Sequence, residues 1–126
     1  MNSEVRKKLK EIQIEDYIWV IYIGIIILSW YSNSLERKYY IFKDLKSKHD
    51  YQKIITIIFS ILVVVYVYFL KGSIDDIVSL KPTDSNKRKN LVYLSFVASL
   101  MIAISGFIFL YISLVDNDLD VEIAFN

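Results

Sequence analysis

The chain has no cysteine, and only one histidine, one proline and three glycines occur among its 126 residues. The lack of cysteine excludes disulfides, thiolate metal sites and cysteine nucleophiles, and it carries no information about the redox compartment. The single histidine, His49, lies between Lys48 and Asp50, with no second histidine or cysteine to complete a metal-ligand spacing. We therefore expect His49 to lie in a solvated connection, and we expect no cofactor, no bound metal and no small-molecule substrate.

Charged residues are also missing from three long stretches, although the chain contains 15 Lys and Arg and 14 Asp and Glu. The stretches 17–35, 54–70 and 91–115 hold 19, 17 and 25 residues without Asp, Glu, Lys, Arg or His. As helices they would reach roughly 29, 26 and 38 Å, against a hydrocarbon core of about 30 Å. The sequence therefore predicts an all-α integral membrane protein with three transmembrane helices in one membrane domain, residues 1–126.

Two other folds are disfavoured by the same stretches. A soluble three-helix bundle needs a polar stripe that recurs every 3.6 residues, and none is present. A membrane β-barrel needs strands that alternate apolar and polar residues, which these stretches do not do. Aromatic residues gather at the ends of the stretches, as is typical of the membrane interface.

The first apolar stretch ends in small residues, Ser32-Asn33-Ser34, which allows a cleaved signal peptide as an alternative. The segment before it carries four acidic residues beside four basic ones, and the apolar stretch is longer than the usual 7–15 residues of a signal. Bulky Trp30 and Tyr31 also precede the candidate cleavage site. We therefore expect a retained first helix.

The segments outside the spans have distinct patterns. Residues 1–16 have apolar Val5, Leu9 and Ile12 among charges and predict a short amphipathic helix at the membrane surface. Residues 36–53 form a basic, aromatic connection into which the first helix is expected to continue, because apolar residues recur at helical spacing. In the connection 71–90, a helix stop is predicted at Lys71-Gly72. Ser73 is expected to cap a short helix that ends at Lys81-Pro82, and residues 83–90 are expected to form a polar turn.

Small residues recur at spacings of three or four in two of the spans. Such residues let helix backbones approach closely in a membrane, where lipid removes the hydrophobic drive for association. The pattern favours either packing among the three spans of one chain or a face for a second copy. The predicted helix-packing residues are Thr56 and Ser60 in the second span and Ser95, Ser99, Ala103 and Gly106 in the third.

The first connection contains six basic residues interleaved with aromatic ones. Such bases can bind anionic lipid headgroups or simply anchor the helix ends at the membrane surface. The three acidic residues of the same connection halve its net charge, which favours ordinary anchoring. The predicted headgroup residues are Arg37, Lys38, Lys43, Lys46, Lys48 and Lys53.

The last segment, 116–126, is acidic and contains no basic residue. Its aspartates begin like a calcium loop, but the glycine at position six and the glutamate at position twelve are missing, so no tight calcium site is expected. Apolar residues alternate with acids, which predicts either a strand that docks on the sheet edge of a partner or a disordered acidic end. The docking residues of the strand interpretation are Leu119, Val121, Ile123 and Phe125.

Basic residues in the segments between spans predict the orientation, because cytoplasmic segments are enriched in Lys and Arg. Segments 1–16 and 71–90 together hold nine, whereas 36–53 and 116–126 together hold six. The count favours a cytoplasmic N-terminus.

Several stretches resemble small, uncharacterised multi-pass membrane proteins of low-GC bacteria, namely 80–85, 93–99 and 118–126. The excess of lysine over arginine, twelve against three, agrees with such a source. The resemblance implies membrane residence and no activity.

No span contains an ionisable side chain for ion transport, and no nucleophile and base are paired for an enzyme that acts on lipid. We expect a non-enzymatic accessory or interaction subunit, whose partners are the lipid bilayer and another membrane protein or a second copy, with no nucleic acid. The alternative is a holin-like pore former, because one class of holins is also short and has three spans. The acidic tail counts against this alternative, since the tails of such proteins are usually basic.

Overall fold

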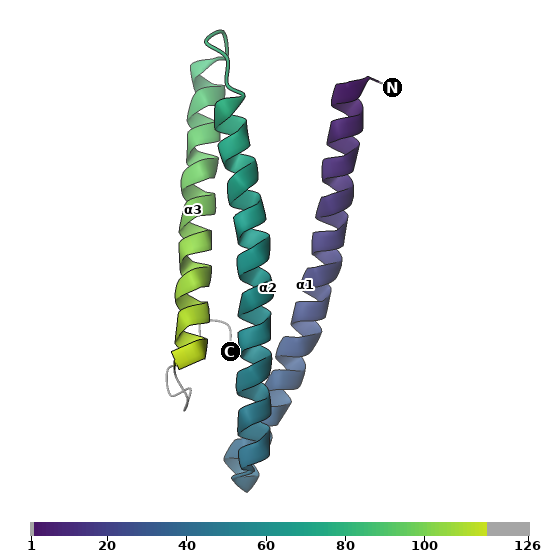
Figure 1. Cartoon of the computed structure of the whole chain (residues 1–126), viewed down its shortest axis with the longest axis vertical. Helices are drawn as coiled ribbons and strands as arrows, with labels where there is room; N and C mark the ends of the chain where they lie inside the picture. Colours follow the sequence, from purple (N-terminus) through teal and green to yellow (C-terminus); the bar gives the residue numbers. More distant parts are fainter. Residues whose placement is uncertain (1, 116–126) are drawn as a thin grey trace. The chain divides into compact units, whose positions relative to one another are not determined.

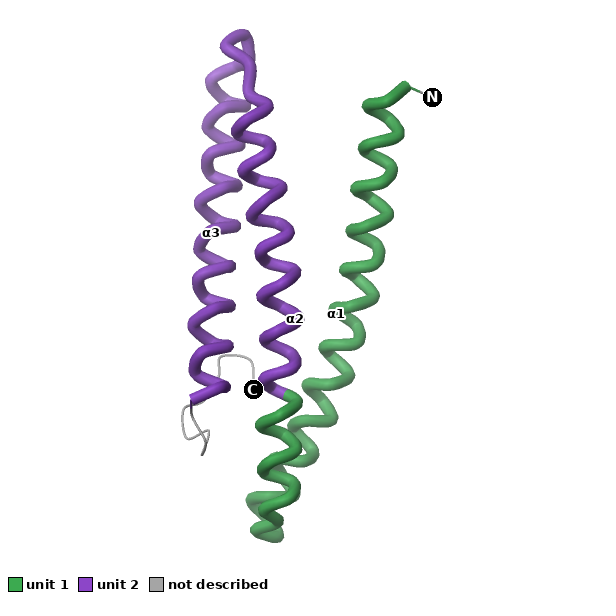
Figure 2. Tube along the Cα trace, viewed as in Figure 1, with its two compact units in different colours: residues 1–54 green, residues 55–126 purple. Residues whose placement is uncertain are grey.

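The computed structural model describes residues 2–115, and over this range it is built from helices without strands (Figure 1). The helices are α1 (Ser3–Phe42), α2 (Leu45–Val78) and α3 (Asn86–Val115). All three are long and apolar enough to cross a membrane. The prediction of an all-α protein with three candidate membrane-spanning helices is therefore confirmed. The chain divides into two compact units, 1–54 and 55–126, with the boundary inside α2 (Figure 2).

Helix α1 is longer than its apolar stretch at both ends. Asn2 caps its start, since its side-chain oxygen accepts a hydrogen bond of 2.8 Å from the Val5 backbone N–H. The amphipathic segment before the first span is helical as expected, but it forms the first turns of α1 rather than a separate helix. At the other end the helix continues beyond residue 35 to Phe42, as the apolar spacing predicts.

Lys43 ends α1 in the left-handed conformation, with φ 54° and ψ 35°, and is the only non-glycine residue with positive φ among residues 2–115. Its backbone N–H donates to the Tyr39 carbonyl over 2.7 Å, which satisfies one of the last free carbonyls of the helix. Glycine would adopt this conformation without the steric cost that a lysine Cβ brings. The chain reverses direction here and enters α2 after only Lys43 and Asp44.

Helix α2 passes through Lys71 and Gly72 without interruption, so the predicted stop at this point is wrong. A glycine ends a helix when it adopts positive φ, and no glycine of the described chain does so. Ser73 does not cap a new helix either, because its hydroxyl donates to the Leu70 carbonyl over 2.7 Å inside α2. The residues of the expected short helix are the last turns of α2, which ends at Val78, before Lys81-Pro82 is reached.

The α2–α3 turn is shorter than predicted, since α3 begins at Asn86 and residues 86–90 are helical rather than part of a polar turn. Asp84 organises the turn by accepting a hydrogen bond of 2.7 Å from the Lys81 backbone N–H. Ser85 caps α3, because its hydroxyl accepts from the Arg88 backbone N–H over 3.1 Å. This cap replaces the one that the sequence suggests at Ser73.

Within unit 55–126, α2 and α3 lie side by side and run antiparallel (Figures 1 and 2). The rings of Phe59 and Phe109 stack with centroids 5.4 Å apart and an interplanar angle of 25°. Phe59 and its neighbour Ile58 are almost completely buried. The two helices therefore share a packed apolar seam, and most of their remaining apolar side chains stay exposed.

Candidate functional site

The small residues of α3 lie against α2 of the same chain in one part of the predicted face. Ala103 is 2% exposed, and Gly106, three residues on, is buried. A Cβ added to Gly106 would lie 2.8 Å from Cδ2 of Tyr66 and 3.5 Å from Cγ2 of Val63. Glycine is therefore the residue that lets the Tyr66 ring lie against the backbone of α3. The sequence left two alternatives for this face, packing within one chain or contact with a second copy. At Gly106 the structure has packing within the chain.

Polar groups join the same seam nearer the end of α3. The Thr56 hydroxyl donates to the Ser113 carbonyl over 3.5 Å, so Thr56 lies in the α2–α3 contact. Ser113 is buried, and its own hydroxyl donates to the Leu110 carbonyl over 2.8 Å. Sequence reasoning missed Ser113, although it lies seven residues after Gly106 and continues the same helical face.

The other predicted packing residues lie outside the buried seam. Ser60 is exposed, and its hydroxyl donates to the Thr56 carbonyl over 2.8 Å within α2. Ser95 is also exposed, and Ser99 is half-buried. A spacing of four places these residues near the predicted face, but the side chains that fill the seam, Phe59, Val63 and Tyr66, are large. Around Gly106 the seam is thus a contact of larger α2 side chains, Val63 and Tyr66, with a small residue of α3.

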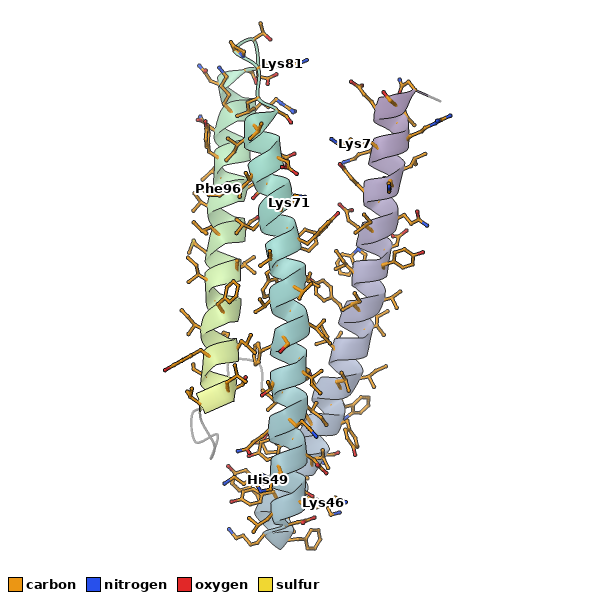
Figure 3. All side chains as sticks on the ribbon, viewed as in Figure 1. Lys7, Lys46, His49, Lys71, Lys81 and Phe96 are labelled. Atoms are coloured by element: carbon orange, nitrogen blue, oxygen red, sulfur yellow. The ribbon has the colours of Figure 1, made fainter. Side chains whose placement is uncertain are left out.

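The basic residues of the first connection surround the α1–α2 turn, which lies within unit 1–54. Lys38 forms an ion pair with Asp44, Nζ to Oδ2 3.7 Å. The Lys48 ammonium lies 5.4 Å from the centre of the Tyr39 ring, which also contacts the rings of Tyr40 and Tyr51. Exposed positions are occupied by Arg37, Lys43, Lys46 and Lys53, and His49 is exposed as well, in the region labelled in Figure 3. Lys38 and Lys48 therefore also support the turn itself.

Asp44 is the residue that holds this turn together. Its side chain accepts hydrogen bonds from the Ser47 hydroxyl, over 2.8 Å, and from the Lys46 backbone N–H, over 3.2 Å. The hydrogen bond from Ser47 is the largest cause that lowers the pKa of Asp44 below its ordinary value, and the Lys46 N–H and the Lys38 charge act in the same direction. The ionised carboxylate is thus the form that the folded turn favours.

Apolar side chains are exposed at the same turn. Ile41 is 63%, Phe42 71% and Leu45 64% exposed, on the two sides of Lys43 and Asp44. We call these three residues the tip patch. Lys43 follows Phe42 and Lys46 follows Leu45, so the patch is an apolar surface with basic neighbours.

The remaining predicted sites have no counterpart in the described structure. The tail residues Leu119, Val121, Ile123 and Phe125, and the aspartates of the incomplete calcium pattern, lie outside residues 2–115. Within that range there is no group of three or more His, Cys, Asp or Glu side chains that could hold a metal ion.

Comparison with known proteins gives no relative: no protein family, no curated protein and no solved structure matches the chain.

Replacing Gly106 by leucine should destabilise the α2–α3 hairpin. The new side chain has no room beside Tyr66, and overpacking of this kind costs about 1–3 kcal/mol. Thermal unfolding of the purified protein in mild detergent measures the effect. Gly72→Leu is the matched control, since nothing lies within 4 Å of a Cβ at that position of α2. Equal unfolding temperatures for the two variants would contradict the close approach at Gly106.

Acid should weaken the α1–α2 turn through Asp44. Its folded-state pKa is lowered, so the stabilisation is present above the ordinary carboxyl pKa of 3.8 and is lost as the pH falls through the folded value. We expect the wild-type protein to lose more thermal stability between pH 7 and pH 3 than Asp44→Asn, which lacks the ionising group. A pH dependence unchanged by Asp44→Asn would show that the carboxylate does not contribute.

Proposed function

We propose that the chain is a multi-pass protein of a cell membrane with a cytoplasmic N-terminus, and that it serves as a non-enzymatic accessory or interaction subunit of a membrane complex. The observation that carries the proposal is the tip patch, an apolar surface that projects beyond the apolar stretches. Membrane residence explains the exposed apolar surface of the spans, and a protein partner explains the exposed apolar surface outside them.

The apolar windows of the three helices support residence in a bilayer. A third or less of each window is buried by the chain itself, 11% in α1, 33% in α2 and 17% in α3. Soluble monomers rarely expose contiguous apolar patches larger than a few hundred Å². Lipid tails cover such a surface at no cost, because they are as apolar as the side chains they contact.

The tip patch lies farther out than lipid tails reach. Phe42 is seven residues beyond residue 35, which is about 10 Å along a helix, and Leu45 is nine residues before residue 54, about 13 Å. The headgroup region adds only about 5–8 Å to each side of the hydrocarbon core. The bases nearest the spans, Arg37 and Lys53, are therefore at headgroup depth, whereas the tip patch lies at or beyond the outer edge of the headgroups.

The charges around the tip patch indicate what covers it. Lys43 and Lys46 are each adjacent in sequence to a residue of the patch, so contact between the patches of two copies would bring these like charges together, which is unfavourable. A different membrane protein with an apolar site and an acidic rim fits better. The orientation follows from the nine basic residues in segments 1–16 and 71–90 against six elsewhere, which places the tip outside the cytoplasm.

A photo-crosslinking amino acid at Phe42 should give one discrete adduct with a second membrane protein in intact cells. The same probe at Val20, which is 65% exposed within the first span, should give mainly lipid adducts. Lys43→Glu with Lys46→Glu should remove the adduct at Phe42, whereas Lys7→Glu with Lys8→Glu, far along α1, should leave it. Denaturing electrophoresis and mass spectrometry identify the product.

Three results would contradict the proposed role. An adduct of two 14.8 kDa chains would make the partner a second copy. The absence of any protein adduct at Phe42 would remove the evidence for a partner. Abrupt leakage of a dye from cells on induced expression would favour the holin-like alternative.

A further inference from the structure

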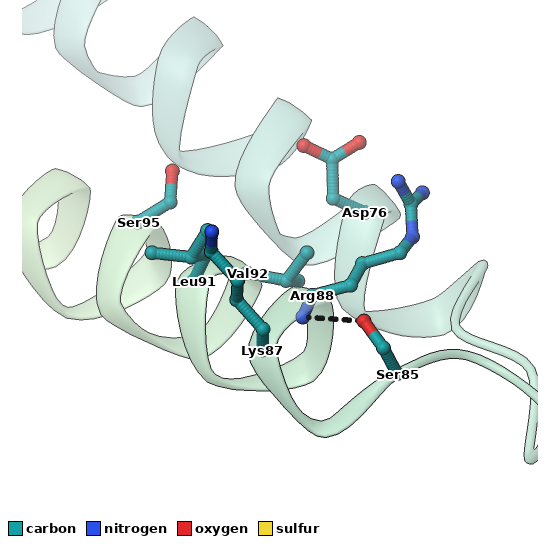
Figure 4. Close-up of a pocket in the computed structure, with 7 residues that line it drawn as sticks. All are labelled: Asp76, Ser85, Lys87, Arg88, Leu91, Val92 and Ser95. Carbon is teal, nitrogen blue, oxygen red and sulfur yellow. Dashed lines mark hydrogen bonds between the residues drawn. The ribbon is translucent and has the colours of Figure 1, made fainter.

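An open depression lies at the turn end of the α2–α3 hairpin, entirely within unit 55–126 (Figure 4). Its volume is about 390 Å³, and we call it the turn groove. Helix α2 contributes Asp76, the turn contributes Ser85, and the start of α3 contributes the other five residues. The lining residues are Asp76, Ser85, Lys87, Arg88, Leu91, Val92 and Ser95.

The charges of the turn groove are balanced. Asp76 supplies a carboxylate from α2, and Lys87 and Arg88 supply two cations from α3. Arg88 also forms an ion pair with Asp84, Nε to Oδ2 3.7 Å, so two acids and two bases face this region. Lys87 and Asp76 have no ion pair within the described part of the chain. A ligand that carries one negative and one positive group matches the groove better than a simple anion.

The depth at which the groove would lie in a bilayer is consistent with a lipid ligand. Asp76 is six residues beyond the second apolar stretch, about 9 Å along the helix, and Lys87 is four residues before the third, about 6 Å. These distances place Lys87 within the headgroup layer of one leaflet and Asp76 at the outer edge of that layer. Leu91 and Val92 begin the third apolar stretch, so this part of the lining lies at the depth at which the acyl chains start.

We propose that the turn groove binds a phospholipid whose headgroup ends in a primary ammonium, phosphatidylethanolamine. Lys87, with Arg88 beside it, holds the phosphate, and Asp76 accepts hydrogen bonds from the ammonium. Leu91 and Val92 contact the first methylenes of the acyl chains. The proposal rests on the proposed residence in a membrane, and it assigns that membrane a specific lipid contact.

The groove discriminates among headgroups by what each can offer Asp76. A choline group has no N–H to donate, and proteins recognise it with aromatic cages, whereas no aromatic residue lines the groove. Phosphatidylglycerol has no cation, so it would leave the carboxylate unpaired beside its own phosphate. Of these three lipids, the ethanolamine lipid alone offers both a phosphate to Lys87 and an N–H donor to Asp76.

The test is native mass spectrometry of the full chain released from nanodiscs that contain equal amounts of phosphatidylethanolamine, phosphatidylcholine and phosphatidylglycerol. The wild-type protein should retain the ethanolamine lipid in preference to the other two. Asp76→Asn should lower this preference roughly fivefold, since a partly solvated charge-assisted contact is worth about 1 kcal/mol. Lys87→Gln should instead lower the retention of all three lipids, because each of them carries the phosphate that Lys87 binds. Asp76→Lys should shift the preference to phosphatidylglycerol, because the groove then holds only cations and Asp84.

Matched controls are Asp75→Asn and Lys81→Gln, which change the same charges next to the groove without altering its lining. Equal retention of the three lipids by the wild-type protein, or an Asp75→Asn effect as large as that of Asp76→Asn, would overturn the proposal. Glycerophosphoethanolamine, added without acyl chains, should not compete; full competition would identify a soluble headgroup site instead. A chain that fails to enter nanodiscs would contradict the proposed membrane residence, and a chain that enters without lipid preference would contradict only the turn groove.

Discussion

A peptide group in the hydrocarbon core of a membrane has no water to bond with, and this constraint governs the architecture of the chain. Each helical residue satisfies its backbone internally, so the three uncharged stretches are stable as helices despite many β-branched residues. The constraint also explains which hydrogen-bond partners the polar side chains within the spans find. The hydroxyls of Ser60, Ser105 and Ser113 each donate to a carbonyl three or four residues earlier in their own helix.

The second requirement is contact between helices when water does not drive them together. The α2–α3 hairpin meets it by shape: the flat face at Gly106 accepts the Tyr66 ring, and Phe59 stacks on Phe109. The turn at Asp84 and Ser85 keeps the two helices adjacent in sequence, which lowers the entropy cost of bringing them together.

Much of this fold follows from the sequence, because charge is absent over spans of the right length and helix is the structure that a bilayer admits. The extension of α1 to Phe42 also follows, since apolar residues recur at helical spacing past residue 35. The helix stop predicted at Gly72 is wrong because a glycine inside a helix lowers its stability by only about 1 kcal/mol. The helical residues on both sides of Gly72 offset this loss. Whether a glycine stops a helix depends on its φ angle, and sequence spacing does not reveal that angle.

The candidate sites were harder to predict, for a related reason. A spacing of four places Ser95 and Gly106 near one face, but it does not say which part of that face meets large residues such as Tyr66. The turn groove was not predictable because Asp76 and Lys87 belong to different helices and line the same depression only when the turn closes. The tip patch was visible as apolar residues in a charged connection, yet its exposure depends on how Lys43 and Asp44 reverse the chain.

The central claim is that the chain crosses a membrane three times, and single-cysteine labelling in intact cells tests it most directly. The chain has no cysteine of its own, so Lys7→Cys, Lys46→Cys, Thr83→Cys and Asn126→Cys each introduce a unique thiol. With a membrane-impermeant maleimide, the variants at 46 and 126 should react in intact cells, and those at 7 and 83 only after permeabilisation. Reaction of positions 7 and 126 from the same side would contradict three crossings.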